Sequence, residues 1–191
     1  MSILQRVALV LVSPKTAWEE ATTQSGSDWG YILVLAAIGP LFDVYARPHL
    51  GDVSSSSEAA RIVAIHNAGI MGDYIQSVGL AYVLVKLANA LMGENPRNIT
   101  FVAYSLTPYF VCEASLRYTG FGVSDNRFNI YILGLLAGTL YSIAQGYWGL
   151  KYFYQDARPS ARLLAFSVAA IAANFALFLV LTVMTRKLVG R

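Results

Sequence analysis

The chain has 191 residues, of which 56% are hydrophobic and only 13% are charged. A soluble domain carries about 25% charged residues, so this composition argues against a soluble globular protein and favours a membrane protein. Basic residues outnumber acidic ones by 14 to 11, an excess that is too small to predict nucleic-acid binding but that suits contact with anionic lipid headgroups.

Residues 1–27 are predicted to lie on the membrane surface ahead of the first span. One helical face of this segment is apolar, which is typical of a short interfacial helix: Ile3, Leu4, Val7, Val10 and Leu11. Ser13-Pro14 predicts a second short helix, because serine favours the N-cap and proline the first helical position. Trp18, in this second helix, is expected to anchor at the lipid headgroups.

Five apolar stretches follow, and each is about long enough to cross a bilayer as a helix. They cover roughly residues 29–45, 69–91, 99–118, 128–150 and 163–185. A helix rises 1.5 Å per residue, so about 20 mainly apolar residues cross about 30 Å of hydrocarbon. The connections are too short to hold an independent domain. The sequence therefore predicts one domain, residues 1–191, with an all-α fold: a polytopic bundle of five transmembrane helices preceded by short interfacial helices.

Charged side chains within these stretches are expensive, at about 2.5–3.5 kcal/mol each on insertion scales, so each needs a reason. With the N-terminus inside, the charged side chains near the outer level are Asp43, Asp73, Glu113 and Arg117, with His66 one heptad before Asp73. One interpretation is an outward-facing cation or proton site. The other is internal pairing or placement at the headgroup boundary. Glu113 and Arg117 have the spacing of an i,i+4 ion pair, as do Asp43 and Arg47, and Asp73 would lie at the boundary. No spacing typical of a metal site is present.

Two prolines and a glycine pair bear on how the helices pack. Pro40 and Pro108 fall inside predicted spans, where each removes a backbone donor and should kink or loosen its helix. A gating hinge and a static packing kink both remain open. The Gly134-x-x-x-Gly138 pattern indicates close helix packing, with a partner helix in the same chain or in a second copy.

Two local patterns then suggest a family. Ser13-Pro14-Lys15-Thr16-Ala17-Trp18 precedes the first span, and the turn Gly93-Glu94-Asn95-Pro96-Arg97 leads into Tyr104-Ser105-Leu106-Thr107-Pro108. With five predicted spans, the chain resembles the bacterial branch of the Yip (Ypt/Rab-interacting protein) family of membrane proteins. The resemblance implies a protein of the cell membrane, which in bacteria is the inner membrane, with its N-terminus in the cytoplasm. The count of basic residues does not decide the orientation, because seven fall on each side.

The resemblance implies little chemistry. Eukaryotic relatives associate with small GTPases, generally through longer cytosolic N-terminal regions, so the short segment here argues against small-GTPase binding. The sequence contains no Ser/His/Asp set with catalytic spacing, no zinc-protease motif and no phosphate-binding glycine loop. We therefore expect no enzymatic activity and no cofactor. The preferred interpretation is a membrane scaffold that organises lipids, other membrane proteins or a second copy of itself. The alternative is a small channel or transporter for a cation, proton or small solute.

Overall fold

The computed structural model describes residues 2–23, 28–45, 56–118, 128–156 and 159–189. These ranges are helical apart from short connections and contain no strand, which confirms the all-α fold. The helices are α1 (Ile3–Val12), α2 (Pro14–Ala21), α3 (Trp29–Tyr45), α4 (Ser56–Met92), α5 (Arg97–Tyr118), α6 (Phe128–Trp148), the π-helical turn η1 (Gly149–Phe153) and α7 (Pro159–Val189).

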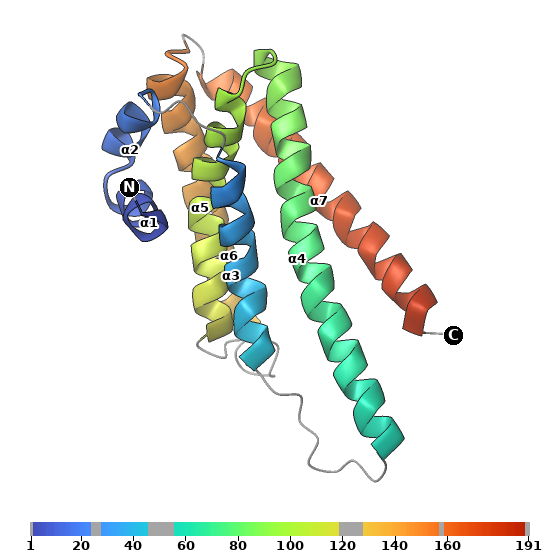
Figure 1. Cartoon of the computed structure of the whole chain (residues 1–191). Coiled ribbons are helices and arrows are strands. Elements are labelled where there is room, and N and C mark those ends of the chain that lie inside the picture. Colours follow the sequence, from blue (N-terminus) through green and yellow to red (C-terminus); the bar gives the residue numbers. More distant parts are fainter. Residues whose placement is uncertain (1, 24–27, 46–55, 119–127, 157–158, 190–191) are drawn as a thin grey trace.

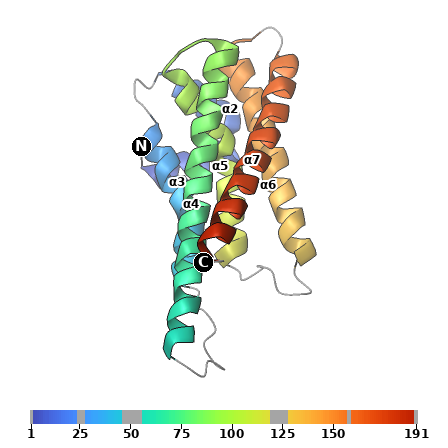
Figure 2. The same cartoon turned by 90° about the vertical axis from the view of Figure 1, so that its right-hand side faces the viewer.

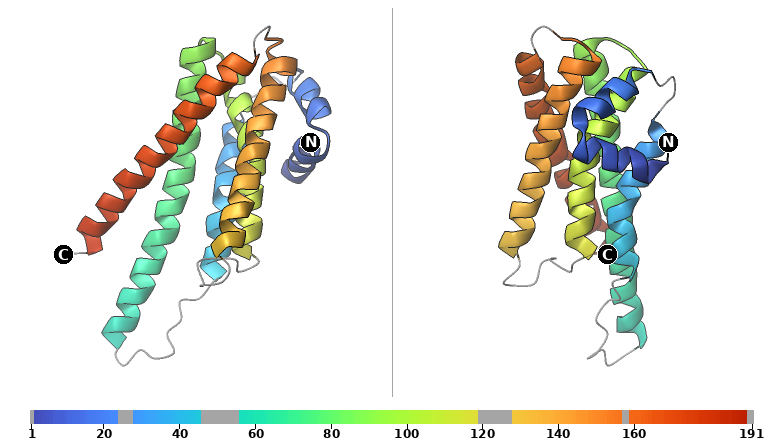
Figure 3. Two further views of the ribbon diagram at one scale, coloured as in Figure 1. Left: turned by 180° about the vertical axis from the view of Figure 1, so that it is seen from behind. Right: turned by 90° about the vertical axis from the view of Figure 1, so that its left-hand side faces the viewer.

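The helices form three groups (Figure 1). Helices α3, α5 and α6 lie side by side in the middle of the molecule, and the short helices α1 and α2 pack against one side of this group. Helices α4 and α7 pack against each other on the opposite side and lean away from the centre towards the end where α4 begins (Figures 2 and 3). The turn between α4 and α5, residues 93–96, marks the other end of the bundle, which we call the turn end.

Two helices extend well beyond the apolar stretches predicted to cross the membrane. Helix α4 begins at Ser56 rather than near Gly69, since its first turns contain Glu58 and two alanines, which favour a helix without being strongly apolar. Helix α7 begins at Pro159 rather than Leu163, with proline at the first helical position. Hydropathy locates the hydrocarbon-crossing part of a helix but not its ends.

Among the described residues, α4 is the one helix long and apolar enough to cross a membrane by length and composition. Three shorter apolar helical stretches, Ile3–Val12, Trp29–Phe42 and Pro159–Ala172, fall below that length. Within the described ranges the structure thus contains one candidate span, and the five-span count stays a prediction.

The expectation that Trp18 anchors at the headgroups is wrong. Its side chain is 0% exposed and packs against Tyr104 and Phe153, with ring centroids 5.2 Å and 5.6 Å away. The indole N–H donates to Gln145 Oε1 at 3.1 Å. Hydropathy could not foresee this, because a buried tryptophan and an interfacial one have the same sequence signature.

Gln145 of α6 also ties α1 to the bundle. Its side-chain amide donates to the carbonyl of Val10 at 2.5 Å, and the hydroxyl of Tyr141 donates to the carbonyl of Leu11 at 2.5 Å. These two carbonyls belong to the last turn of α1, where backbone acceptors have no partner within the helix. The N-terminal helices are therefore fixed to α6 by both packing and hydrogen bonds.

The glycine pair of α6 faces α5 of the same chain. A Cβ atom added at Gly138 would lie 2.8 Å from Cys112 Cβ, and one at Gly134 would lie 2.8 Å from the Leu116 side chain. The Cys112 thiol also donates to the carbonyl of Gly134 at 2.9 Å. The close packing thus occurs within one chain.

Replacing Gly138 with alanine should destabilise the protein by about 1–3 kcal/mol, because the added methyl group would overlap a rigid Cβ atom of α5. Gly69→Ala is the matched control, since no atom lies within 4 Å of a Cβ added there and alanine favours a helix. Thermal unfolding of the purified variants measures both. Equal unfolding temperatures for the two variants would contradict the packing described here.

Candidate functional site

The charged residues predicted at one level include a three-membered cluster, formed by Asp73 of α4 with Glu113 and Arg117 of α5. Arg117 Nη1 lies 2.9 Å from Asp73 Oδ2, and Arg117 Nη2 lies 2.8 Å from Glu113 Oε1. The side chains of Arg117 and Glu113 are 14% and 11% exposed, and that of Asp73 is 44% exposed. One guanidinium thus bridges two carboxylates and links α4 to α5.

Helix α3 meets the same cluster through a glycine. A Cβ atom added at Gly39 would lie 3.5 Å from Arg117 Cδ and 3.8 Å from the Glu113 carboxyl carbon. The arginine side chain therefore passes directly over the backbone of α3, next to the buried Pro40. Three helices converge on this one ionic group.

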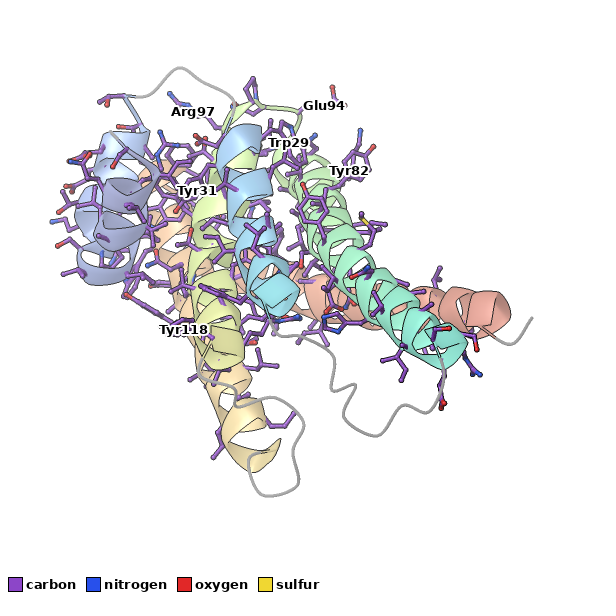
Figure 4. The ribbon with its side chains drawn as sticks, turned by 60° about the horizontal axis from the view of Figure 1, so that its bottom comes forward. Trp29, Tyr31, Tyr82, Glu94, Arg97 and Tyr118 are labelled. Atoms are coloured by element: carbon purple, nitrogen blue, oxygen red, sulfur yellow. The ribbon has the colours of Figure 1, made fainter. Side chains whose placement is uncertain are left out.

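The cluster lies far from the turn end. Asp73 is 19 residues before Met92, and Arg117 is 20 residues after Arg97, which places them about 28–30 Å from the turn along the helix axes. Figure 4 shows Glu94 and Arg97 at the turn end and Tyr118 at the opposite end of α5. This distance is about the thickness of the hydrocarbon layer of a bilayer, about 30 Å.

The structure does not add the other two predicted site residues, His66 and Asp43, to this cluster. His66 is half-buried on α4, seven residues before Asp73, and this spacing corresponds to about 10 Å along the helix. The side chain of Asp43 lies outside the described residues. Within the described part, no three His, Cys, Asp or Glu side chains come together as a metal site would require. The cation-site hypothesis stays a prediction, and the geometry places a guanidinium between two of its carboxylates.

Sequence reasoning identified the pairing of Glu113 with Arg117 but missed the link to Asp73. Helical spacing fixes which residues of one helix share a face, whereas contact between α4 and α5 depends on how the helices pack. Three charges at one predicted depth were the available signal. Their opposite signs could have suggested a shared ionic group.

The backbone around Pro108 is tied to its neighbours. Proline cannot donate, and the next amide, that of Tyr109, donates to Ser142 Oγ of α6 at 3.1 Å. Thr107 Oγ1 donates to the carbonyl of Ala103 at 2.9 Å and hydrogen-bonds to the hydroxyl of Tyr31 in α3, 3.0 Å away. Side chains of two adjacent helices thus hold this loosened segment.

A second buried polar group lies at the turn end. The Asn98 amide donates to Asn89 Oδ1 at 2.5 Å and to the carbonyl of Gly93 at 2.8 Å. Its oxygen accepts from the hydroxyl of Tyr154 at 2.5 Å, and burial raises the pKa of Tyr154, which keeps that hydroxyl protonated as a donor. Gly93 has a φ of +84°, a left-handed conformation that favours glycine. These bonds fix the connection between α4 and α5.

Comparison with known proteins adds a family. No curated protein matches the chain, and no solved structure matches it. The family model described as the Yip1 domain matches residues 8–183, from α1 to the last turns of α7. This match covers most of the chain and both of the local patterns that suggested the resemblance. The chain therefore belongs to the Yip1 domain family of membrane proteins.

Proposed function

We propose that this protein is a non-enzymatic membrane scaffold that crosses the cell membrane five times, with its N-terminus in the cytoplasm. The observation that carries this proposal is the bridging of Asp73 and Glu113 by Arg117. A transport site needs carboxylates that can exchange a cation or proton, whereas these two already pair with a fixed positive charge. The charged groups inside the helices would serve to hold α3, α4 and α5 together.

The outer surface of the bundle also supports a role among lipids. Large apolar side chains are exposed along α4, α6 and α7: Val63, Ile65, Met71, Ile75, Leu133, Leu136, Leu140, Leu164, Val168 and Ile171. So much exposed apolar surface is typical of contact with a membrane or a partner. Lipids, other membrane proteins or a second copy of the chain are the partners that such a scaffold would organise.

Ion flux into sealed vesicles tests the proposal. We expect the reconstituted wild-type protein to move neither protons nor monovalent cations above the rate of empty vesicles. Asp73→Asn and Glu113→Gln should lower the folding yield but leave the flux at that background, because they weaken a structural ionic group. Flux through the wild-type protein that Glu113→Gln abolishes at equal protein content would overturn the scaffold and establish a transporter.

A further inference from the structure

A cavity of about 120 Å³ lies between the α4–α7 pair and the α5–α6 pair. Its walls are mostly apolar and come from all four helices, including Leu84, Val102, Ile143 and Phe166. The volume is close to that of engineered apolar cavities of about 150 Å³ that bind benzene. A short length of hydrocarbon therefore fits this space.

One wall of the cavity carries a buried polar group with no hydrogen-bond partner in the part of the chain that the structure describes. Ser105 of α5 is 5% exposed and lines the cavity, and its hydroxyl has no hydrogen-bond partner among the described residues. A buried hydroxyl without a partner costs about 1–3 kcal/mol, so such groups are rare in folded proteins. A ligand with one acceptor would satisfy this hydroxyl.

The position of Ser105 indicates which part of a ligand it would meet. A Cβ atom added at Gly146 would lie 3.6 Å from Ser105 Oγ and 3.1 Å from Leu163 Cδ1, so the hydroxyl lies near the start of α7. Phe166 lines the cavity and also a small recess that reaches Arg162, a half-exposed cation paired with Asp156 at 3.3 Å. A positive charge, a hydroxyl donor and an apolar cavity thus follow one another inward from the turn end.

The cavity also opens to the outer surface. Ile171 lines it and is 62% exposed, and the neighbouring residues Leu164 and Val168 of α7 are exposed as well. In a membrane protein, the medium outside such an apolar surface is the acyl-chain region of the bilayer. A lipid can enter the cavity from that side without crossing water.

We propose that this cavity binds one acyl chain of an ester-linked glycerophospholipid from the leaflet at the turn end. The ester carbonyl of the lipid accepts a hydrogen bond from the hydroxyl of Ser105. The acyl chain lies between the two helix pairs, and the phosphate lies near Arg162. This inference rests on the proposed function, in which the protein organises lipids. It adds the class of lipid, an ester-linked glycerophospholipid.

Photolabelling in phosphatidylcholine vesicles tests it. The probes are two phospholipids with the same diazirine-bearing chain, one ester-linked and one ether-linked, and mass spectrometry locates the adducts. We expect adducts on cavity residues such as Ile143 and Ile171, with the ester probe labelling more than the ether probe. Ser105→Ala should lower ester labelling roughly 2- to 10-fold, the range for one hydrogen bond, and leave ether labelling unchanged. Because no described residue hydrogen-bonds to this hydroxyl, the variant should fold normally.

A second variant tests the proposal by filling the cavity with a larger side chain. Ala170 lines the cavity, so Ala170→Leu should remove most labelling by both probes, whereas Ala137→Leu, on the exposed face of α6, adds the same bulk without effect. Labelling spread evenly over the exposed apolar residues and indifferent to Ala170→Leu would overturn the proposal, as would equal ester and ether labelling of the wild type. Cavity labelling that disappears as the protein-to-lipid ratio is raised would overturn it in favour of a second copy of the chain as the occupant. Ion flux in the same vesicles reports separately on the scaffold, so the two failures are distinguishable.

Discussion

Arg117→Met should destabilise the protein by about 3–5 kcal/mol, the largest effect we expect at any charged position. Removing one partner of a buried ionic group leaves the remaining charges uncompensated. Here the variant would leave Glu113, 11% exposed, without its guanidinium and would break the link from α5 to Asp73 of α4. Denaturant or thermal unfolding of the purified protein in micelles measures the loss.

The reverse test is rescue. Adding Glu113→Gln and Asp73→Asn to Arg117→Met removes all three charges, and we expect much of the stability to return because no buried charge is left unpaired. Arg61→Met is the matched control, since Arg61 lies exposed on the first turns of α4. A stability loss that the two carboxylate changes deepen rather than relieve would show that the three charges do not act as one group.

Trp18→Ala should cost about 3–5 kcal/mol and release the N-terminal helices from the bundle. Large-to-small changes of a fully buried tryptophan leave a cavity that the surroundings fill only in part. The change also removes the partner of Gln145 Oε1, a buried amide oxygen. Unfolding measures the loss of stability, and cleavage by added protease within residues 2–21 measures release of the helices.

Two variants make this result specific. Trp18→Phe keeps most of the ring packing against Tyr104 and Phe153 and should cost less than Trp18→Ala. Trp29→Ala removes a half-buried tryptophan whose ring centroid is 6.4 Å from that of Tyr82, and should leave α1 and α2 protected. Equal protease sensitivity of Trp18→Ala and Trp29→Ala would mean that Trp18 does not hold the N-terminal segment.

The sequence predicted most of the helices because long apolar helices have strong local signals. Apolar runs of the right length located the cores of α3 to α7, and Ser13-Pro14 located the boundary between α1 and α2. The first turns of α4 were not predicted, because hydropathy indicates which residues suit a hydrocarbon environment rather than which residues are helical. The π-helical turn that begins at Gly149 was not predicted. Gly149 lies against the Trp18 ring, 2.9 Å from where a Cβ would lie, and hydropathy does not report such a contact.

The candidate site was only half predictable for a related reason. The i,i+4 spacing of Glu113 and Arg117 is a property of one helix, so it can be read from the chain. Three features depend on how the helices pack: the approach of Asp73, the passage of Arg117 over Gly39, and the hydroxyl of Ser105, which no described residue hydrogen-bonds. No local pattern encodes them.

The proposed scaffold crosses the membrane as a sealed bundle of helices in which charges pair with one another. Side-specific thiol labelling tests it most directly, with single cysteines placed in a Cys112→Ala background at Glu94, Ala114 and Tyr118. We expect an impermeant maleimide to label Glu94→Cys from one side of the membrane only and Tyr118→Cys from the other side. Ala114→Cys, 4% exposed beside Glu113, should resist labelling from both sides. Labelling of Glu94→Cys and Tyr118→Cys from the same side, or rapid labelling of Ala114→Cys, would contradict the account.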